Sequence, residues 1–437
     1  MHARLKFFAF FALFALLIAA CAPDEPAAPV DEETPEEEPV DEEPEEEPEE
    51  EPVDDEDEPV VRAEADLVIW ADDTRTPALQ PFADEFGADN EVEVAVQELG
   101  FGDIRDGLVV SGPAGEGPDI IIGAHDWLGE LVENGVVAPI DLSGVEGDLE
   151  EVAVQAFTFD GQTYGVPYAL ENVALFRNTE LVPDAPATWE ELEETALALQ
   201  EDGEVEQGVV WPAEPADPYH NYPIVTAHGG YVFGMQDDGT YDPSDLGIDS
   251  EGGLEAARHF GEMIERGVLS PDITYELMIE FFGGGDAAYA ITGPWAMRDF
   301  DTAGVPYEVT PIPDIAGGTP QPFVGVQGFM VSAFAENELL ANTFVLDYMT
   351  TTDAQLAMFE ADARPPALTA AFEEVADDPN IEGFGEAGAA GVPMPAIPEM
   401  ASVWEAWTDA YELLYEGALE PEEAFEQAAE QIRGLIQ

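Results

Sequence analysis

The sequence predicts an α/β fold with largely parallel sheets. Two observations carry this prediction: short apolar runs typical of strands alternate with longer runs of helical periodicity, and no solenoid repeat or second long apolar stretch follows the N-terminal one. The expected strands cover residues 67–70, 92–99, 119–122 and 287–291, and the expected helices cover 77–86, 188–200, 251–266, 336–350, 401–416 and 421–436. About 377 residues after the N-terminal segment suggest two domains.

The expected strands are recognised by the pattern of their apolar residues. Leu67–Trp70 and Asp119–Ile122 contain continuous apolar runs, which are typical of strands covered on both faces. Val92–Leu99 alternates apolar and polar residues, as expected for a strand with one solvated face. Ala287–Ile291 leads into Gly293-Pro-Trp295, where the proline favours the first turn of a helix.

The helices are recognised by their start signals and apolar stripes. Thr188-Trp-Glu-Glu191 has the spacing of a capping box, so a helix is expected to begin there and to run to about Gln200. Glu251–Arg266 and Glu336–Thr350 have the periodicity of amphipathic helices. The regular alternation of these helices with strands is what favours the α/β class.

The charge excludes some functions. The chain of 437 residues has 97 acidic residues against 11 basic ones, a formal net charge of −86, and Lys6 is its only lysine. A basic face for nucleic acid is excluded, because phosphate neutralisation needs clustered lysine and arginine. Residues 22–60 hold 22 of the acids, and the remaining 75 face only nine arginines over residues 61–437. Such an acidic folded part predicts adaptation to high salt, where the screening length falls to about 3 Å.

The N-terminal segment predicts export and membrane attachment. A basic stretch containing Lys6 precedes the apolar run Phe7–Ala20, which is too short to span a bilayer and indicates a signal peptide over residues 1–20. The run ends in Ala-Ala-Cys21, which resembles the lipobox of bacterial lipoproteins, so Cys21, the only cysteine, is the expected lipid anchor. Residues 21–62 form a Pro/Glu/Asp-rich tract, which is expected to be an extended, disordered tether.

Several catalytic chemistries lack the residues they need. Without a lysine after Lys6, the exported chain has neither a P-loop lysine nor a Schiff-base lysine. It has no HExxH motif, no thiol nucleophile and no Gly-x-Ser-x-Gly elbow, and the histidines lack metal-ligand spacing at His125, His220, His228 and His259. We therefore expect neither a metal nor a cofactor. A carboxylate pair of the glycoside-hydrolase type stays open, because acidic residues are so frequent.

Seven short blocks, in this order, resemble one known family. They are Gly117-Pro-Asp-Ile-Ile121 with Ala124-His-Asp126, Tyr164-Gly-Val-Pro-Tyr-Ala-Leu-Glu171, Thr188-Trp-Glu-Glu191, His228-Gly-Gly-Tyr231, Gly293-Pro-Trp-Ala296, Pro322-Phe-Val-Gly-Val326 and Met394-Pro-Ala-Ile-Pro-Glu-Met400. They make the part of the chain from Leu67 to the C-terminus, about 370 residues, similar to bacterial solute-binding proteins of the maltose/maltodextrin-binding type. The resemblance implies a protein that is not an enzyme and that delivers a captured sugar to the membrane permease subunits of an ABC importer.

The resemblance also implies an architecture. Family members have the two-lobed periplasmic-binding-protein fold, in which each lobe is a mixed, mostly parallel sheet flanked by helices and three crossings let the lobes close on ligand. The crossings are expected near Ala169–Asn172, Val324–Gly328 and Val375–Pro379. The implied N-lobe comprises residues 63–170 and 327–375, and the implied C-lobe comprises residues 171–326 and 376–437. A monomer on the outer face of the cytoplasmic membrane, periplasmic or at the cell surface, is expected.

The family pattern implies nine ligand contacts. A pyranose needs aromatic platforms for its faces and charged or amide groups for its hydroxyls. The implied contacts are Asp73, Arg75, Asp126, Trp127, Glu171, Asp217, Tyr219, Trp295 and Trp404. Trp295 and Trp404 match stacking tryptophans of the family, whereas Glu171 and Asp126 match acids that accept sugar hydroxyls.

Some of these positions leave a structural alternative open. Arg75 could instead form a salt bridge at a helix end, and Asp72 competes with Asp73 for the acidic role. Trp127 stands at the position of a loop arginine of the family, close to Gly123, where the maltose-binding type has an aromatic residue. Trp127 could therefore restore a stacking surface or simply pack in the core.

Further departures leave the exact sugar open. Asp217 stands at a glutamate position of the family, His220 at an aromatic position and Thr408 at an arginine position. Maltose or a longer α-glucan is the first expectation, with trehalose, cyclodextrin or another oligosaccharide as alternatives. The alternatives from other classes are a secreted glycoside hydrolase and a binding protein of the same fold for a non-sugar solute such as a polyamine.

Overall fold

The computed structural model describes residues 62–236 and 240–436. The expected signal peptide, the anchor Cys21 and all but the last residue of the expected tether lie outside the described residues. Of the helices in the described part, none is both long enough and apolar enough to cross a membrane.

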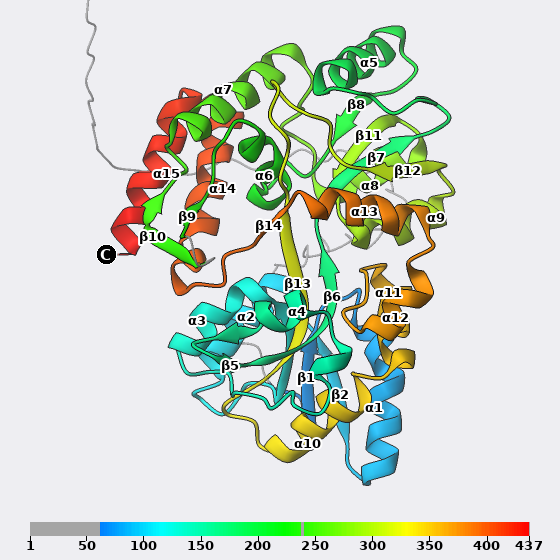
Figure 1. Ribbon diagram of the computed structural model, residues 1–437, viewed down its shortest axis with the longest axis vertical. Coiled ribbons are helices and arrows are strands. Elements are labelled where there is room, and N and C mark those ends of the chain that lie inside the picture. The colour runs from blue at the N-terminus through cyan, green and yellow to red at the C-terminus, as the bar shows by residue number, and fades with distance from the viewer. Residues whose placement is uncertain (1–61, 237–239, 437) are drawn as a thin grey trace, which may run out of the picture. The chain divides into compact units, whose positions relative to one another are not determined.

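The first sheet has six strands in the order β14-β13-β3-β1-β2, with β6 also paired to β13 (Figure 1). Its strands are β1 (Leu67–Ala71), β2 (Val94–Glu98), β3 (Ile120–Ala124), β6 (Gly165–Glu171), β13 (Phe323–Val331) and β14 (Val392–Pro393). Every residue of β1 and β3 is buried, as their continuous apolar sequences predict. β1 runs parallel to β2 and β3, whereas β13 runs antiparallel to β3 and β6.

The second sheet has four strands in the order β12-β7-β11-β8. They are β7 (Ala174–Asn178), β8 (Gln207–Val210), β11 (Ala287–Thr292) and β12 (Tyr307–Thr310). Only β8 and β11 are parallel, because β7 runs against both β11 and β12. Two small hairpins complete the strands: β4 (Thr158–Phe159) with β5 (Gln162–Thr163), and β9 (Phe233–Met235) with β10 (Tyr241–Leu246).

The sequence-based expectation of mixed, mostly parallel sheets holds only in part. Parallel pairs in the two sheets are limited, within the described residues, to β1–β2, β1–β3, β13–β14 and β8–β11, and the other four pairs are antiparallel. The physical reason is the path of the chain: β13 follows β12 of the second sheet and enters the first sheet against the direction of β3. The apolar content of a strand shows that it is buried but not which way it runs.

The helices that accompany the first sheet include the two expected from the sequence, over 77–86 and 336–350, and five that were not expected. They are α1 (Thr76–Asn90), α2 (Phe101–Ser111), α3 (Leu128–Glu133), α4 (Glu151–Ala156), α10 (Glu338–Thr343), α11 (Thr352–Asp362) and α12 (Thr369–Val375). The helix expected over 336–350 is instead α10 followed by a π-helical turn, Phe344–Tyr348. The wider turn lets Phe344 and Tyr348 both pack edge-on against Phe86 of α1, with ring centroids 5.4 and 5.0 Å away.

The remaining helices follow strands of the second sheet or pack near it. They are α5 (Trp189–Asp202), α6 (Pro218–Ala227), α7 (Glu251–Arg266), α8 (Tyr275–Gly284), α9 (Met297–Ala303), α13 (Pro379–Ala389), α14 (Ala401–Tyr415) and α15 (Pro421–Leu435). The expected capping box is confirmed at α5: the Thr188 hydroxyl accepts a hydrogen bond from the Glu191 N–H (3.3 Å). The Glu191 carboxylate accepts in turn from the Ala187 N–H (2.7 Å), one residue earlier than in the ideal motif.

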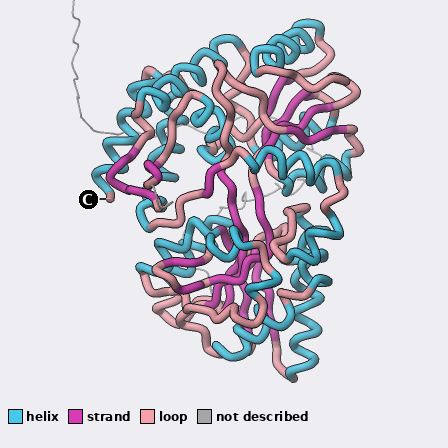
Figure 2. Tube along the Cα trace, viewed as in Figure 1, coloured by secondary structure: helices cyan, strands magenta, loops and turns pink. Residues whose placement is uncertain are grey.

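The chain runs between the two sheets more than once. It leaves the first sheet at the end of β6 and returns to it in β13. After α12 it forms α13, which packs on β12, and it then pairs with β13 again in β14. Figure 2 shows β6 and β13 extending out of the first sheet toward the second. The lobe boundaries and the hinge crossings stay predictions.

Candidate functional site

A cavity of about 590 Å³ is lined by residues that follow strands of both sheets. Eight of the nine expected contact residues line it: Asp73, Asp126, Trp127, Glu171, Asp217, Tyr219, Trp295 and Trp404. These residues come from positions more than 330 residues apart in the sequence, so the tertiary fold brings them together. The volume is within the range of about 300–1,000 Å³ that is common for small-molecule sites.

Arg75, the ninth expected residue, lies behind the cavity wall. Its side chain is completely buried, and its guanidinium bonds to Asp72 and to the Tyr168 hydroxyl and lies 3.7 Å from Asp362. Asp72 also accepts hydrogen bonds from the backbone N–H of Arg75 (3.0 Å) and the hydroxyl of Thr74 (2.9 Å). The structure therefore has the salt bridge at the start of α1 that was the alternative for Arg75, and it leaves Asp73 as the exposed acid of this loop.

Asp126 has one carboxylate oxygen that lacks a hydrogen-bond partner among the described residues. It lies in the 3₁₀ turn His125–Trp127 that follows β3, and its Oδ2 accepts a hydrogen bond from Trp404 Nε1 (3.1 Å). Its Oδ1 is buried and has no hydrogen-bond partner among the described residues. Burial raises the pKa of Asp126 to about 7, although Arg105 and the Trp404 hydrogen bond act in the opposite direction. A buried acceptor without a partner is costly, so a donor supplied by a ligand would stabilise it.

Glu171, at the end of β6, is held as a charged carboxylate. Arg364 Nε donates to its Oε2, and Gln327 Nε2 donates to its Oε1 (2.8 Å). Burial by itself would raise the pKa of Glu171, but the charge and hydrogen bond of Arg364 and the charge of Arg75 bring it below its ordinary value. Because the amide nitrogen of Gln327 faces Glu171, its Oε1 is left buried and without a partner in the described part of the chain.

Asp217 and Tyr219 lie at the start of α6. Asp217 is the N-cap residue: its Oδ1 accepts from the Tyr219 N–H (2.8 Å), and its Oδ2 pairs with His220 Nδ1. Burial opposes ionisation, but His220 and the backbone N–H groups hold the pKa of Asp217 below its ordinary value. The Tyr219 hydroxyl is buried and is not hydrogen-bonded to any described residue. Asp217 therefore positions the helix start, while Tyr219 presents a free polar atom.

Aromatic rings form two groups along the cavity. In the first group, Trp295 lies with its ring centroid 6.1 Å from that of Tyr219, and Phe323 lies 6.1 Å from Tyr219 and 6.2 Å from Trp404. In the second group, Phe101 lies 4.6 Å from Trp127. An added Cβ at Gly123 would lie 2.0 Å from Trp127 Cζ3. The Trp127 ring thus occupies the space of a side chain at position 123.

His125, next to Asp126, has a structural position. Its Nδ1 accepts a hydrogen bond from the Val326 N–H (3.1 Å), so its Nε2 donates to the Met394 carbonyl (3.0 Å). Burial lowers the pKa of His125 to about 4, and the neutral imidazole therefore joins the end of β3 to β13 and to the segment after β14.

The sequence analysis missed several residues that line the cavity. They are Asp72, Thr74, Phe101, Gly102, Arg105, Ala124, His220, Tyr275, Asp299, Gln327, Arg364 and Met394, of which only Asp72 and His220 had been discussed as alternatives or departures. Gln327 directly follows the block that ends at Val326, so its place in an expected crossing was an available signal. For Arg364 the signal was its rarity, because the chain has so few arginines.

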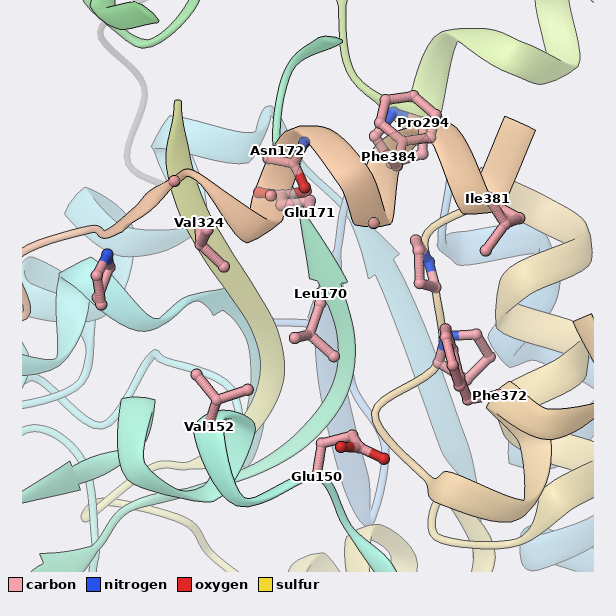
Figure 3. A pocket seen from close by; sticks show the side chains of 16 residues that line it. Glu150, Val152, Leu170, Glu171, Asn172, Pro294, Val324, Phe372, Ile381 and Phe384 are labelled. Atoms are coloured by element: carbon pink, nitrogen blue, oxygen red, sulfur yellow. The ribbon is translucent and has the colours of Figure 1, made fainter. Parts of the chain in front are cut away.

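A second cavity, of about 410 Å³, is lined by residues of β6, β13, α12 and α13 (Figure 3). Leu170, Val324 and Pro393 line this second cavity, whereas Gln327 and Met394 line the first and Glu171 lines both. The second cavity is mainly apolar, with Val152, Leu170, Val324, Phe372, Ile381 and Phe384 around it. It offers few hydrogen-bonding groups, so the first cavity is the candidate site.

Within the described residues, no group of three or more His, Cys, Asp or Glu is arranged to hold a metal ion. His228 and His259, 31 residues apart in the sequence, do lie together, with His228 Nε2 2.8 Å from His259 Nδ1. A single N–H···N hydrogen bond accounts for this contact.

The first cavity thus combines aromatic faces with buried acceptors that lack donors. Such a site suits a neutral ligand that has several hydroxyl groups and weakly apolar ring faces. Its charged groups do not suit an anion: six carboxylates line it, against the two arginines Arg105 and Arg364, and both arginines already pair with carboxylates.

Comparisons with known proteins agree with this chemistry. Residues 82–383 match the family model described as bacterial extracellular solute-binding protein. The chain is 28% identical over 386 residues to the galactooligosaccharide-binding protein of Bacillus subtilis, which covers 85% of this chain and 90% of that protein. It is 30% identical over 371 residues to the maltodextrin-binding protein MdxE of the same organism, a match that covers 80% of this chain and 85% of that protein. It is 31% identical over 351 residues to the maltotriose-binding protein of Pyrococcus abyssi, a match that covers 77% of this chain and 75% of that protein.

Proposed function

The chain belongs to the bacterial extracellular solute-binding protein family, and from this premise we propose that it captures an oligosaccharide outside the cell and delivers it to an ABC importer. The relatives named above bind galactooligosaccharides, maltodextrin or maltotriose by their names, and another relative is named a maltooligosaccharide ABC transporter solute-binding lipoprotein. The protein acts as a binding component without catalysis.

One observation carries the proposal: three residues that line the cavity each carry a buried polar atom that has no partner in the described structure. These atoms are Asp126 Oδ1, Gln327 Oε1 and the Tyr219 hydroxyl. Two of them can only accept hydrogen bonds when Asp126 is ionised, so the missing partner is a molecule with donor groups. Sugar hydroxyls are such donors, and the rings of Trp295 and Trp404 are suited to the faces of a pyranose.

Capture works by closure of two lobes around the ligand. Glu171 ends β6 and Gln327 lies in the middle of β13, and the two side chains are hydrogen-bonded (2.8 Å) where the chain passes between the two sheets. Ligand contacts from both sides of the cavity favour the closed state, because binding shifts the equilibrium toward the conformation with more contacts. The lobes follow the boundaries expected from the sequence, residues 63–170 with 327–375 and residues 171–326 with 376–437.

The first candidate ligand is a maltodextrin-type sugar, with galactooligosaccharides as the competing class suggested by a relative's name. The protein acts as a monomer, is lipid-anchored through Cys21 and works on the outer face of the cytoplasmic membrane. The acidic tract between residues 21 and 62 then serves as the tether between anchor and fold.

Isothermal titration calorimetry with a panel of sugars tests the proposal. The panel contains glucose, maltose, maltotriose, cyclodextrin, trehalose and a galactooligosaccharide, with spermidine as a non-sugar control. We expect micromolar or tighter binding of at least one oligosaccharide, about −8 kcal/mol. Absence of heat with every sugar would contradict the function, heat with spermidine alone would favour a polyamine-binding protein, and release of smaller sugars during incubation would indicate a hydrolase.

A matched pair of variants connects binding to the cavity. Asp126→Asn removes the charge of this carboxylate. At about pH 8.5, where Asp126 is ionised, the variant is expected to weaken binding at least tenfold, since a hydrogen bond to a charged group contributes about 1.5–3 kcal/mol. Asp141→Asn makes the same chemical change at an exposed site outside the cavity and is expected to leave affinity unchanged. Equal affinities of the two variants would mean that the sugar binds elsewhere.

A further inference from the structure

Arg298 differs from the other arginines of the described chain. The other eight each form an ion pair with a carboxylate, whereas Arg298 forms none with any described residue. Its exposed side chain, in α9, instead donates a hydrogen bond from Nη1 to the backbone carbonyl of Ala361 (3.4 Å), 63 residues further along the chain. In a protein with so many carboxylates, this choice of partner is unusual.

The carbonyl that Arg298 binds lies at the C-terminal end of α11. The last carbonyls of a helix have no partner within the helix and carry partial negative charge. One of them, that of Phe359, accepts a hydrogen bond from the Ala363 N–H (2.7 Å), and that of Ala361 accepts from Arg298. A cation at this position stabilises a helix end. Arg298 therefore caps a helix that belongs to a distant part of the sequence.

The capped helix end is connected to the candidate site. Asp362 is the last residue of α11, and Arg364, two residues later, pairs with it (2.9 Å) and lines the first cavity. Trp295, three residues before Arg298, lies with its ring centroid 5.0 Å from Arg364 Cζ. The segment from Trp295 to Arg298 thus contacts the end of α11 and the residues after it twice, through the Trp295 ring and through the Arg298 guanidinium.

The Arg298 contact joins α9 to α11, two helices that Figure 1 shows next to each other. α9 lies in the lobe expected around the second sheet, and α11 lies in the lobe expected around the first. A cavity of about 360 Å³ is lined by residues of both helices, among them Asp301 and Glu360, and by Asp378 before α13. Arg298 is the one basic residue among the described residues that line it, so its charge offsets the repulsion between acids on the two sides.

We propose that Arg298 is a positioning residue for sugar capture: from outside the first cavity it holds the end of α11 against the segment that carries Trp295, and so keeps the two lobes closed on the ligand. The inference rests on the proposed function. Arg298 does not line the first cavity, so it acts on the closed state and not on the ligand itself. A contact made only in the closed state slows the release of the ligand.

Stopped-flow measurement of sugar release, followed by tryptophan fluorescence, tests this role. Wild type, Arg298→Ala and Arg298→Lys are compared with maltotriose as the probe, or with a galactooligosaccharide if only that class binds. Arg258→Ala is the matched control: Arg258 is 48% exposed, does not line the first cavity, and pairs with Glu422 of the same expected lobe. The control therefore removes the same charge without touching a contact between lobes. Thermal unfolding without sugar is measured for each variant.

In dilute buffer we expect Arg298→Ala to release the sugar about fivefold faster than wild type, the effect of one exposed charge contact, with little change in the association rate. The difference is expected to shrink at molar salt, where exposed charges are screened. Arg298→Lys keeps the charge and is expected to restore most of the effect, and Arg258→Ala is expected to behave like wild type.

Three outcomes would overturn the role of Arg298 alone. They are a wild-type release rate in Arg298→Ala, an equally fast release in Arg258→Ala, and a lowered melting temperature of Arg298→Ala without faster release, which would mean that the residue only stabilises the helix end. Absence of sugar binding by wild type would overturn the proposed function and this inference with it.

Discussion

Replacing Arg364 by alanine is expected to destabilise the protein strongly, because Arg364 is the buried partner of two carboxylates. Its side chain is 9% exposed, and it pairs with Glu171 (7% exposed) and with Asp362 (0% exposed), where Nη1 lies 2.9 Å from Oδ2. Its Cζ also lies 5.0 Å from the ring centroid of Trp295. The alanine variant would leave two buried anions without their main counter-charge.

The magnitude follows from what stays behind. Breaking a buried ion pair by removing one partner typically costs about 3–5 kcal/mol. Glu171 would keep the hydrogen bond from Gln327 (2.8 Å), and Asp362 would keep the Tyr168 hydroxyl (3.0 Å) and the more distant Arg75. These remaining partners place the expected loss at the lower end, about 3 kcal/mol of the free energy of unfolding.

Urea unfolding of matched variants measures this loss. Arg258→Ala is the control, because Arg258 and Glu422 form a pair of similar geometry (2.9 Å) whose side chains are 48% and 40% exposed, and such pairs contribute less than about 1 kcal/mol. Adding Glu171→Gln to Arg364→Ala removes one of the unpaired anions and is expected to recover about 1 kcal/mol or more. The difference between Arg364→Ala and the control is expected to persist at molar salt, since buried charges are screened little. A loss in Arg364→Ala as small as in Arg258→Ala would refute the reasoning.

Three further outcomes are expected. Gly123→Ala places a Cβ 2.0 Å from Trp127 and is expected to lower the free energy of unfolding in urea by about 1–3 kcal/mol. The control Gly147→Ala adds a Cβ that meets no atom within 4 Å, so its stability is expected to change by less than about 0.5 kcal/mol. Equal unfolding midpoints of the two variants would contradict the close packing of Trp127 on Gly123. The pKa of His125 is about 4 in the folded protein against 6.5 in the unfolded chain, so the unfolded state takes up the proton first as the pH falls. Roughly 3 kcal/mol of the free energy of unfolding that is present above pH 6.5 is therefore expected to be lost by about pH 4. A His125→Gln variant whose stability falls with pH as steeply as that of wild type would count against this. The acidic folded part is expected to melt at a higher temperature in molar salt than in dilute buffer, and identical melting temperatures would exclude the predicted salt adaptation.

Much of the secondary structure could be predicted from the sequence, because its signals are local. The apolar run Leu67–Trp70 is a buried strand, the capping box at Thr188 starts a helix, and the helices expected from Glu251, Ala401 and Pro421 begin at those residues. Strand direction was not predictable in this way, because it depends on which sheet the chain has just left, as the antiparallel entry of β13 shows.

Many of the residues that line the candidate site could be predicted from the sequence, but their hydrogen-bond partners and ion pairs could not. The family blocks pointed to eight residues that line one cavity, yet they gave no reason to expect Arg364 or Phe101 there. They also could not decide between ligand contact and salt bridge for Arg75. That decision depends on Tyr168 and Asp362, which lie 93 and nearly 290 residues away along the chain.

The sequence by itself determined that this is an acidic α/β protein whose buried strands, helix starts and ordered motifs belong to a solute-binding family. Only the tertiary structure decided which buried polar atoms are left without a hydrogen-bond partner. Asp126 and Trp404 are 278 residues apart, and their hydrogen bond uses one carboxylate oxygen while burial leaves the other without a partner. Burial and spatial neighbours, rather than residue type, set both the pKa of a carboxylate and its capacity to accept a hydrogen bond, and neither is written in the local sequence.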